Sequence, residues 1–373
     1  MQRRARDLGI RIGLGTPGAL NAITDVPGIR VGHHTLNADL PNGNAIRSGV
    51  TIIEPREGPA RLSPCFAGVH VLNGNGDATG LEWIRESGLL TTPIAFTNTH
   101  SVGVVRDTLI AIERAALPET DAVYWTMPVV METFDGLLND INGFHVKPEH
   151  VQAAVADTKG GAVTEGCVGG GTGMICHEFK GGIGTASRVL PAESGGWTVG
   201  AIVQANHGMR NSLMVEGYPV GRYLNTEKIP SPFATDALPH PGMGSIVVTI
   251  ATNAPLLPHQ CTRLAQRASI GIARTGGGTE DSSGDIFLAF STGNTGLPVA
   301  DYGRKGDFTT PLQMVNNDHL SPLLQAAAEA VEEAIVNVLL AAHSVTGHRG
   351  HKAEGLSATQ LLEALTEVGW KAR

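Results

Sequence analysis

The stretch His240-Pro-Gly-Met-Gly-Ser-Ile-Val-Val-Thr-Ile250 joins a proline-containing approach to a run of β-branched residues. This change of composition predicts that a loop ends and a β-strand begins at the Gly244–Ser245 bond. The bond also has a chemical interpretation, because a serine hydroxyl follows the carbonyl of glycine, the least hindered residue. The hypothesis is that the chain cleaves itself here and makes Ser245 a new N-terminus.

Three features distinguish Ser245 from an ordinary serine at a loop–strand junction. The preceding residues 218–244 contain five prolines and little apolar periodicity, which predicts an exposed, adaptable connection. Gly244 leaves its carbonyl open and tolerates a strained backbone. An N-terminal amine has a pKa of about 7.7–8.0, so it can serve as a general base near neutral pH. A small polar residue with no chemical role remains the alternative at this point.

Ser283 and Asp285, in the segment Ser282-Ser-Gly-Asp285, are candidate partners of Ser245. In an extended segment these two side chains project to the same face. A carboxylate and a hydroxyl so placed can hold the amine and the hydroxyl of Ser245. Ordinary turn chemistry explains the same residues equally well.

Composition sets the class of protein. The chain has 373 residues, of which 42% are hydrophobic and 17% charged, which indicates a compact soluble protein of one large domain or two ordinary ones. Its 48 glycines follow no collagen-like period, so we expect them at tight turns and close backbone approaches. A formal charge of -8 without a Lys/Arg cluster argues against a nucleic-acid partner. No secretory signal or membrane span is evident, so we expect a cytoplasmic protein without membrane contact.

Hydrophobic patterning predicts alternating strands and helices and therefore a layered α/β protein. Polar loops such as Asn73–Gly76 and Asn98–Gly103 follow two of the expected strands and are suitable walls of a site. The expected strands are 49–54, 68–72, 93–97, 122–130, 197–204, 245–252 and 285–291. The expected helices are 105–116, 147–156, 258–272, 321–342 and 357–368.

Other chemistries have weaker support. Gly13-Leu-Gly-Thr-Pro-Gly18 matches a dinucleotide-binding pattern by letter, but Pro27-Gly28 follows too soon for the helix that the motif needs. The pairs His33-His34 and His348/His351 lack a recognisable metal-ligand spacing. No Gly-x-Ser-x-Gly occurs. The four cysteines fit neither a metal pattern nor a disulfide framework, and we expect buried free thiols.

Taken together, the motifs around these residues resemble the DmpA family of L-aminopeptidase/D-esterase-amidases, which includes the β-peptidyl aminopeptidases. The resemblance extends over nearly the whole chain and consists of many separate matches in order. They are Asn21-Ala-Ile-Thr-Asp-Val-Pro-Gly, Asn73-Gly-Asn-Gly, Thr97-Asn-Thr-His-Ser-Val-Gly, Glu132-Thr-Phe-Asp-Gly-Leu-Leu-Asn-Asp, Gly171-Thr-Gly-Met, Phe179-Lys-Gly-Gly-Ile-Gly-Thr-Ala-Ser-Arg188, Gln204-Ala-Asn-His-Gly208, Gly244-Ser245 and Ser282-Ser-Gly-Asp.

This resemblance implies a fold and a processing event. The fold is a four-layer αββα sandwich, similar in architecture to the N-terminal-nucleophile hydrolases but differently connected. Cleavage before the serine would divide the single domain 1–373 into an α chain of 1–244 and a β chain of 245–373. The family further implies a tetramer of such αβ units.

The resemblance also implies roles for single residues. Ser245 matches the nucleophile, and Ser283 and Asp285 match the pair that supports it. Asn206 matches the amide that donates to the oxyanion, and Glu132 matches the carboxylate that receives the free amino group of the substrate. Phe134 departs from the family pattern, because some members have tyrosine there and its hydroxyl is absent from this chain.

We therefore expect a self-processing serine peptidase that removes N-terminal residues from short peptides, amides or esters without a metal or organic cofactor. Two alternatives stay open. The first is an acyltransferase resembling the ornithine acetyltransferases, which use threonine as nucleophile. The second is a non-enzymatic, glycine-rich binding or scaffold protein, which predicts an intact and unreactive chain.

Overall fold

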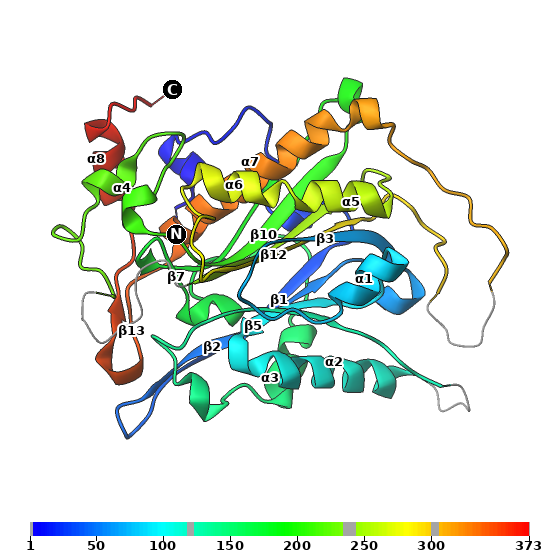
Figure 1. Cartoon of the computed structure of the whole chain (residues 1–373), viewed down its shortest axis with the longest axis horizontal. Helices are drawn as coiled ribbons and strands as arrows, with labels where there is room; N and C mark the ends of the chain where they lie inside the picture. The colour runs from blue at the N-terminus through cyan, green and yellow to red at the C-terminus, as the bar shows by residue number, and fades with distance from the viewer. Residues whose placement is uncertain (1–2, 118–122, 234–243, 300–305, 373) are drawn as a thin grey trace.

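Two β-sheets pack face to face between two layers of helices in the computed structural model, which describes residues 3–117, 123–233, 244–299 and 306–372 (Figure 1). The six-stranded sheet has the order β4 (Leu89–Leu90), β3 (Cys65–Gly74), β12 (Gly284–Ser291), β11 (Ser245–Thr252), β10 (Thr198–Asn206), β9 (Gly182–Val189). The four-stranded sheet has the order β1 (Arg30–Asp39), β2 (Ala45–Glu54), β5 (Ile94–Asn98), β6 (Val129–Thr133).

Helices cover the outer face of each sheet, which confirms the expected αββα sandwich. The six-stranded sheet is covered by α5 (Pro258–Ala265), α6 (Ala268–Arg274) and α7 (Ser321–Ala341), and the four-stranded sheet by α2 (Val102–Ala116) and α3 (Pro148–Ala156). The remaining helices and short strands are α1 (Leu81–Ser87), α4 (Val220–Tyr223), α8 (Ala358–Glu367), β7 (Ile175–Cys176), β8 (Phe179–Lys180), β13 (Val345–Thr346) and β14 (Lys352–Ala353). No helix among the described residues is long and apolar enough to cross a membrane.

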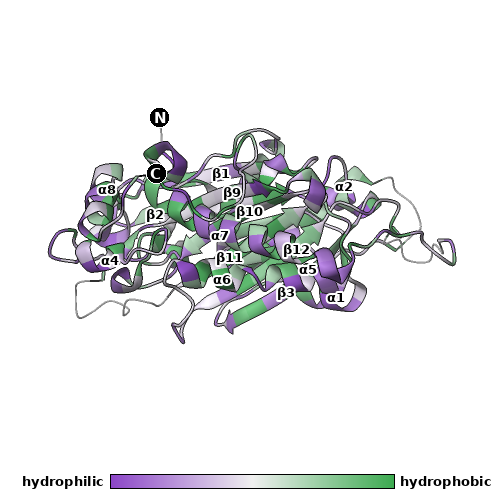
Figure 2. Cartoon of the chain, turned by 90° about the horizontal axis from the view of Figure 1, so that it is seen from above, coloured by the Kyte–Doolittle hydropathy of each residue, from purple (hydrophilic) through white to green (hydrophobic). Residues whose placement is uncertain are grey.

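Strand β11 is buried on both faces, which explains its unbroken apolar sequence. Ile246 and Val248 point into the core between this sheet and helices α5–α7, whereas Val247 and Ala251 point into the core between the two sheets. Complete burial of one such aliphatic side chain contributes roughly 1.5–3 kcal/mol. Figure 2 shows mainly hydrophobic colours on these inner strands and hydrophilic colours on many outer helices and loops.

The pairing of the central strands fixes the position of Ser245. Strand β11 runs parallel to β12 and antiparallel to β10. The register places Ser245 opposite Gly284 on one side and opposite Asn206 on the other. The start of β11, the start of β12 and the end of β10 therefore meet at one edge of the six-stranded sheet.

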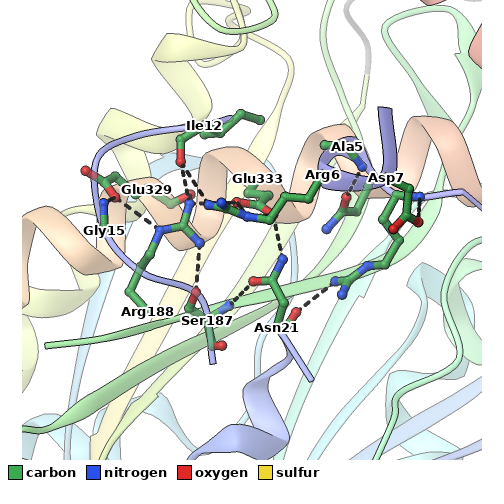
Figure 3. Close-up of polar contacts among 12 residues, drawn as sticks. Ala5, Arg6, Asp7, Ile12, Gly15, Asn21, Ser187, Arg188, Glu329 and Glu333 are labelled. Carbon is green, nitrogen blue, oxygen red and sulfur yellow. Dashed lines mark hydrogen bonds and ion pairs between the residues drawn. The ribbon is translucent and has the colours of Figure 1, made fainter. Parts of the chain in front are cut away.

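A buried ionic network ties the N-terminal segment to this sheet (Figure 3). Arg188 of β9 bonds Glu329 at 3.1 Å and Glu333 at 2.7 Å, both on helix α7. Arg6 adds an ion pair to Glu333 at 2.9 Å, and the side-chain amide of Asn21 donates to the same carboxylate. Two guanidinium groups thus face two carboxylates, so the buried charges are matched.

Three expectations about local structure were wrong, and one strand was missed. The strand expected at 122–130 is β6, which begins only at Val129, and residue 122 lies outside the described residues. The helix expected at 258–272 is two helices, α5 and α6. The glycine-rich segment Gly182–Val189, for which no element was predicted, is a strand, β9. Within the connection 218–244, Val220, Leu224 and Ile229 pack in the main core, and residues 234–243 lie outside the described residues.

Candidate active site

The candidate nucleophile lies at the edge where the three central strands meet. Ser245 is the first residue of β11, and its side chain is buried with the residue only 4% exposed. Asn206, the last residue of β10, is 5% exposed. The structure therefore brings these two sequence-predicted residues together, as neighbours in a strand pair.

The carbonyl of the Gly244–Ser245 bond has a hydrogen-bond donor in place. The backbone N–H of Gly284 donates to the carbonyl oxygen of Gly244 at 3.1 Å and to Oγ of Ser245 at 3.2 Å. A single donor therefore contacts both the attacking oxygen and the carbonyl of the proposed cleavage. A Cβ atom on Gly244 would overlap the carbonyl oxygen of Asn206, so glycine is required here for close approach of the backbones.

Two partners fix the orientation of the Asn206 amide. Its Oδ1 accepts from the backbone N–H of Ile175 at 2.7 Å, and its Nδ2 donates to the carbonyl oxygen of Phe134 at 2.9 Å. An amide nitrogen carries two hydrogens. Within the described residues the second N–H of Asn206 has no acceptor, so it can donate to an oxyanion.

Ser283 and Asp285 form the pair that their spacing predicts. The hydroxyl of Ser283 donates to Oδ1 of Asp285 at 2.6 Å, and both residues are 1% exposed. Burial raises the pKa of Asp285 to about 6, although the hydrogen bond from Ser283 opposes this shift. Asp285 pairs with Ile246 across the β11–β12 ladder, one residue from Ser245.

Glu132 lies on β6 of the other sheet and faces the same edge. Its Oε1 accepts from the backbone N–H of Asp77 at 2.8 Å, and its Oε2 accepts from the hydroxyl of Thr99. Burial raises the pKa of this carboxyl, and the two hydrogen bonds oppose the shift. A Cβ atom built on Gly76 would lie 3.3 Å from both Glu132 Oε1 and Gly284 Cα, so Gly76 packs between the carboxylate and the strand partner of Ser245.

Phe134 contributes its backbone carbonyl to the site, and its ring is partly exposed to solvent. The residue is 42% exposed, and its carbonyl oxygen is the acceptor that holds Asn206. A phenylalanine ring has no hydroxyl to donate. The ring of Phe134 therefore cannot donate a hydrogen bond to an oxyanion at this edge.

Sequence reasoning missed Gly284, Asp77 and Thr99 as functional partners. Asp77 and Gly284 act through backbone N–H groups, which no residue type reveals, and Thr99 lies within the polar loop expected to form a wall.

The remaining expectations about glycine and cysteine hold in part. Glycines 13 and 15 approach Glu329 of α7, as expected for close packing. Of the four free cysteines, Cys65, Cys176 and Cys261 are buried and Cys167 is partly exposed.

Comparisons with known proteins give a family match and several similar chains and structures. The model of peptidase family S58 matches residues 21–353. A β-peptidyl aminopeptidase of Sphingosinicella microcystinivorans is 46% identical, covering 96% of this chain and 90% of its own. The structure of a Burkholderia β-aminopeptidase is 69% identical, with a TM-score of 0.93 and coverage of 99% and 100%. The L-aminopeptidase D-Ala-esterase/amidase of Ochrobactrum anthropi, described as a variant of the Ntn hydrolase fold, is 42% identical with a TM-score of 0.89 and coverage of 98% and 99%.

Proposed function

Because this chain belongs to peptidase family S58, we propose that Ser245 is the nucleophile of an aminopeptidase that the chain activates by cleaving itself. The chain is a hydrolase of the aminopeptidase/amidase type. The observation that carries the assignment of Ser245 is the contact of one donor, the Gly284 N–H, with both Ser245 Oγ and the Gly244 carbonyl.

In the proposed self-cleavage, Ser245 Oγ attacks the carbonyl carbon of Gly244. The Oγ–C bond forms, the C–N bond between the two residues breaks, and the departing amine takes the hydroxyl proton. The Gly284 N–H donates to the carbonyl oxygen as its charge develops. Water then hydrolyses the ester, which leaves an α chain 1–244 and a β chain 245–373 with a free amine and hydroxyl on Ser245.

In peptide hydrolysis the same hydroxyl attacks the substrate carbonyl, with the Ser245 amine as general base. The free N–H of Asn206 and a backbone N–H stabilise the oxyanion, and loss of such a side-chain donor costs about 10²–10³-fold in rate. Asp285 accepts from Ser283 and holds the amine of Ser245 in position. The leaving amine takes a proton, and water activated by the Ser245 amine hydrolyses the acyl-enzyme.

Glu132 receives the free amino group of the substrate. A carboxylate accepts more hydrogen bonds than the two that Asp77 and Thr99 supply, so an ammonium can add a charge-assisted one. This contact would place the amino-terminal residue so that its carbonyl faces Ser245.

The substrates are short peptides, amides or esters with a free amino terminus, and the names of the similar enzymes make β-amino-terminal residues the first candidates. We further propose a cytoplasmic tetramer of αβ units that needs no cofactor for the chemistry.

Mass analysis of purified protein tests the processing step. The unchanged chain should appear as two fragments divided after Gly244, and Ser245→Ala should stay a single chain. The matched control is Ser282→Ala, a neighbouring serine outside the described hydrogen bonds of the site, which should be processed normally. A Ser245→Ala protein that still splits after Gly244 would overturn the scheme.

A substrate panel tests the role of Glu132. Peptides with a free amino terminus should be hydrolysed, and the same peptides with an acetylated terminus should not. Glu132→Gln should raise KM for free-amine substrates through loss of the charge. Equal rates on free and blocked peptides would contradict this assignment.

A further inference from the structure

Three side chains of types that can bind a metal form a cluster next to Asn206, and they have no part in the proposed hydrolysis. Cys176 ends strand β7, His177 follows it, and His207 follows strand β10. All three residues are buried, and one potential ligand atom from each lies within 4.8 Å of the others. Within the described ranges this is the only such group of His, Cys, Asp and Glu side chains.

Two imidazole nitrogens of this cluster have no hydrogen-bond partner among the described residues. His177 is 0% exposed, and its Nδ1 lies 3.0 Å from the carbonyl oxygen of Met209, so Nδ1 carries the proton and the unpartnered Nε2 keeps a lone pair. His207 is 3% exposed, with Nδ1 4.0 Å from Cys176 Sγ and Nε2 unpartnered. A buried ring nitrogen without a hydrogen-bond partner is unfavourable, and a cation bound to that nitrogen would satisfy its lone pair.

We propose that Cys176, His177 and His207 bind a zinc ion. Thiolate sulfur and imidazole nitrogen are the ligands that zinc prefers, and three protein ligands leave a fourth position for water. Bonds of about 2.3 Å to sulfur and about 2.0 Å to nitrogen hold tetrahedral ligand atoms about 3.5 Å apart, so the cluster needs to contract by about one ångström. Binding forms one Zn–S and two Zn–N bonds, and the thiol releases its proton to solvent.

The surrounding backbone favours this arrangement. The Nδ1–H of His177 donates to the carbonyl oxygen of Met209. A histidine that binds a metal through one ring nitrogen typically donates its other ring N–H to such an acceptor. The His177 backbone N–H donates to the carbonyl oxygen of His207 at 2.7 Å, which joins the two segments. A Cβ atom on Gly208 would lie 2.5 Å from the His177 ring, so glycine is needed for the ring to take this place.

The ion would act as a positioning device for Asn206. Ile175, next to Cys176, donates its N–H to Oδ1 of Asn206, and His207 is the residue after Asn206. A metal that binds both segments would therefore hold the amide of Asn206 in one orientation. This consequence rests on the proposed function, whereas the binding of zinc does not. The ion touches no reacting atom, so the hydrolysis itself still needs no metal.

Metal analysis of the full chain tests the proposal. Protein from zinc-supplemented cultures should contain about one zinc ion per chain, and protein from cobalt-supplemented cultures should show sulfur-to-cobalt charge-transfer absorption. Cys176→Ala should lose the absorption and most of the bound metal. The matched control is Cys261→Ala, a buried cysteine outside the cluster, which should keep both.

Zinc-free protein after growth and refolding with zinc would overturn the proposal, as would cobalt absorption that persists in Cys176→Ala. If Cys176→Ala does not fold, the absorption of the unchanged chain decides whether a cysteine is a ligand, and His177→Gln should weaken cobalt binding. Ser245→Ala should bind metal as the unchanged chain does while lacking hydrolysis. The two proposals can therefore fail separately.

Discussion

At Gly244 a single methyl group would collide with the neighbouring strand. The added Cβ would overlap the carbonyl oxygen of Asn206, so the backbones of β10 and β11 must separate to accept it. We expect Gly244→Ala to lower the unfolding free energy by about 1–3 kcal/mol and to slow self-cleavage, because the carbonyl moves away from Gly284. Time-resolved gel analysis measures the cleavage. Gly74→Ala, where a Cβ meets nothing within 4 Å, is the control, and equal cleavage in both variants would contradict the argument.

Asp135 gives the stability a dependence on pH. Burial raises the pKa of its carboxyl to about 7, against hydrogen bonds from Ser48 and Asn139. A raised pKa means that the folded state gains stability at low pH and loses it as pH rises toward 7. Asp135→Asn stays neutral, so its unfolding free energy relative to the unchanged chain should increase between about pH 5 and about pH 8, by about 3 kcal/mol.

Chemical unfolding of the Ser245→Ala form at the two pH values measures this difference without interference from cleavage. Asp318→Asn, at an exposed position, should show no comparable change. A constant difference between Asp135→Asn and the unchanged sequence at both pH values would show that Asp135 does not titrate in this range.

Residues of the site that act through their side chains could be predicted from the sequence. The spacing of Ser283 and Asp285 predicted a shared face, and the structure has the hydrogen bond between them. The contact of the Gly284 N–H with Ser245 could not be predicted in the same way. It depends on the register between β11 and β12, which are about 40 residues apart in the sequence. The role of a backbone group becomes visible only once the sheet is formed.

Among the elements, β9 shows why patterning failed. Its glycines were expected at tight turns or close backbone approaches, and no strand was predicted there. Gly184 lies in a strand against helix α7, where a Cβ would overlap the carbonyl oxygen of Ala334. Glycine here permits a helix to approach a strand closely. Strand β6 was displaced for a related reason: Glu132 and Thr133 are polar, but both are buried with hydrogen-bond partners, so the strand extends over them.

Helix α7 carries the buried acidic groups that hold the N-terminal segment (Figure 3). Glu333→Ala should lower the unfolding free energy by about 3–5 kcal/mol, because it leaves Arg188 with one carboxylate and removes the partner of Arg6. Thermal unfolding measures the loss. Glu363→Ala on helix α8, at an exposed position, is the control and should change little. Equal stability of both variants would show that the network contributes little.

For the whole molecule, the position of the cleavage point predicts the behaviour of the products. The proposed β chain would begin with β11, which lies between β10 of the α chain and β12 of its own chain. The two chains also share the core between the sheets, where Val247 and Ile286 pack with residues of the α chain. We expect the chains to elute together in size-exclusion chromatography and to separate only in denaturant. Separate elution under native conditions would contradict this expectation.

The general architecture could be predicted from two sources. The alternation of strands and helices indicates a layered α/β protein, and the family resemblance implies the αββα sandwich. That Glu132 lies near Gly284, the strand partner of Ser245, could be expected only from the resemblance. Their strands belong to different sheets, and the distance across the sandwich depends on packing, including Gly76 between them. Local patterns describe how each element buries its apolar face, but not which edges of two sheets coincide.

The place of Ser245 in the sheet has a consequence for entropy. A chain end ordinarily frays, and a nucleophile on such an end would have to be immobilised in every catalytic cycle. The end produced at Ser245 would instead be paired on both sides from its first residue. Its conformational freedom would already have been lost when the protein folded, so substrate binding need not supply that free energy again.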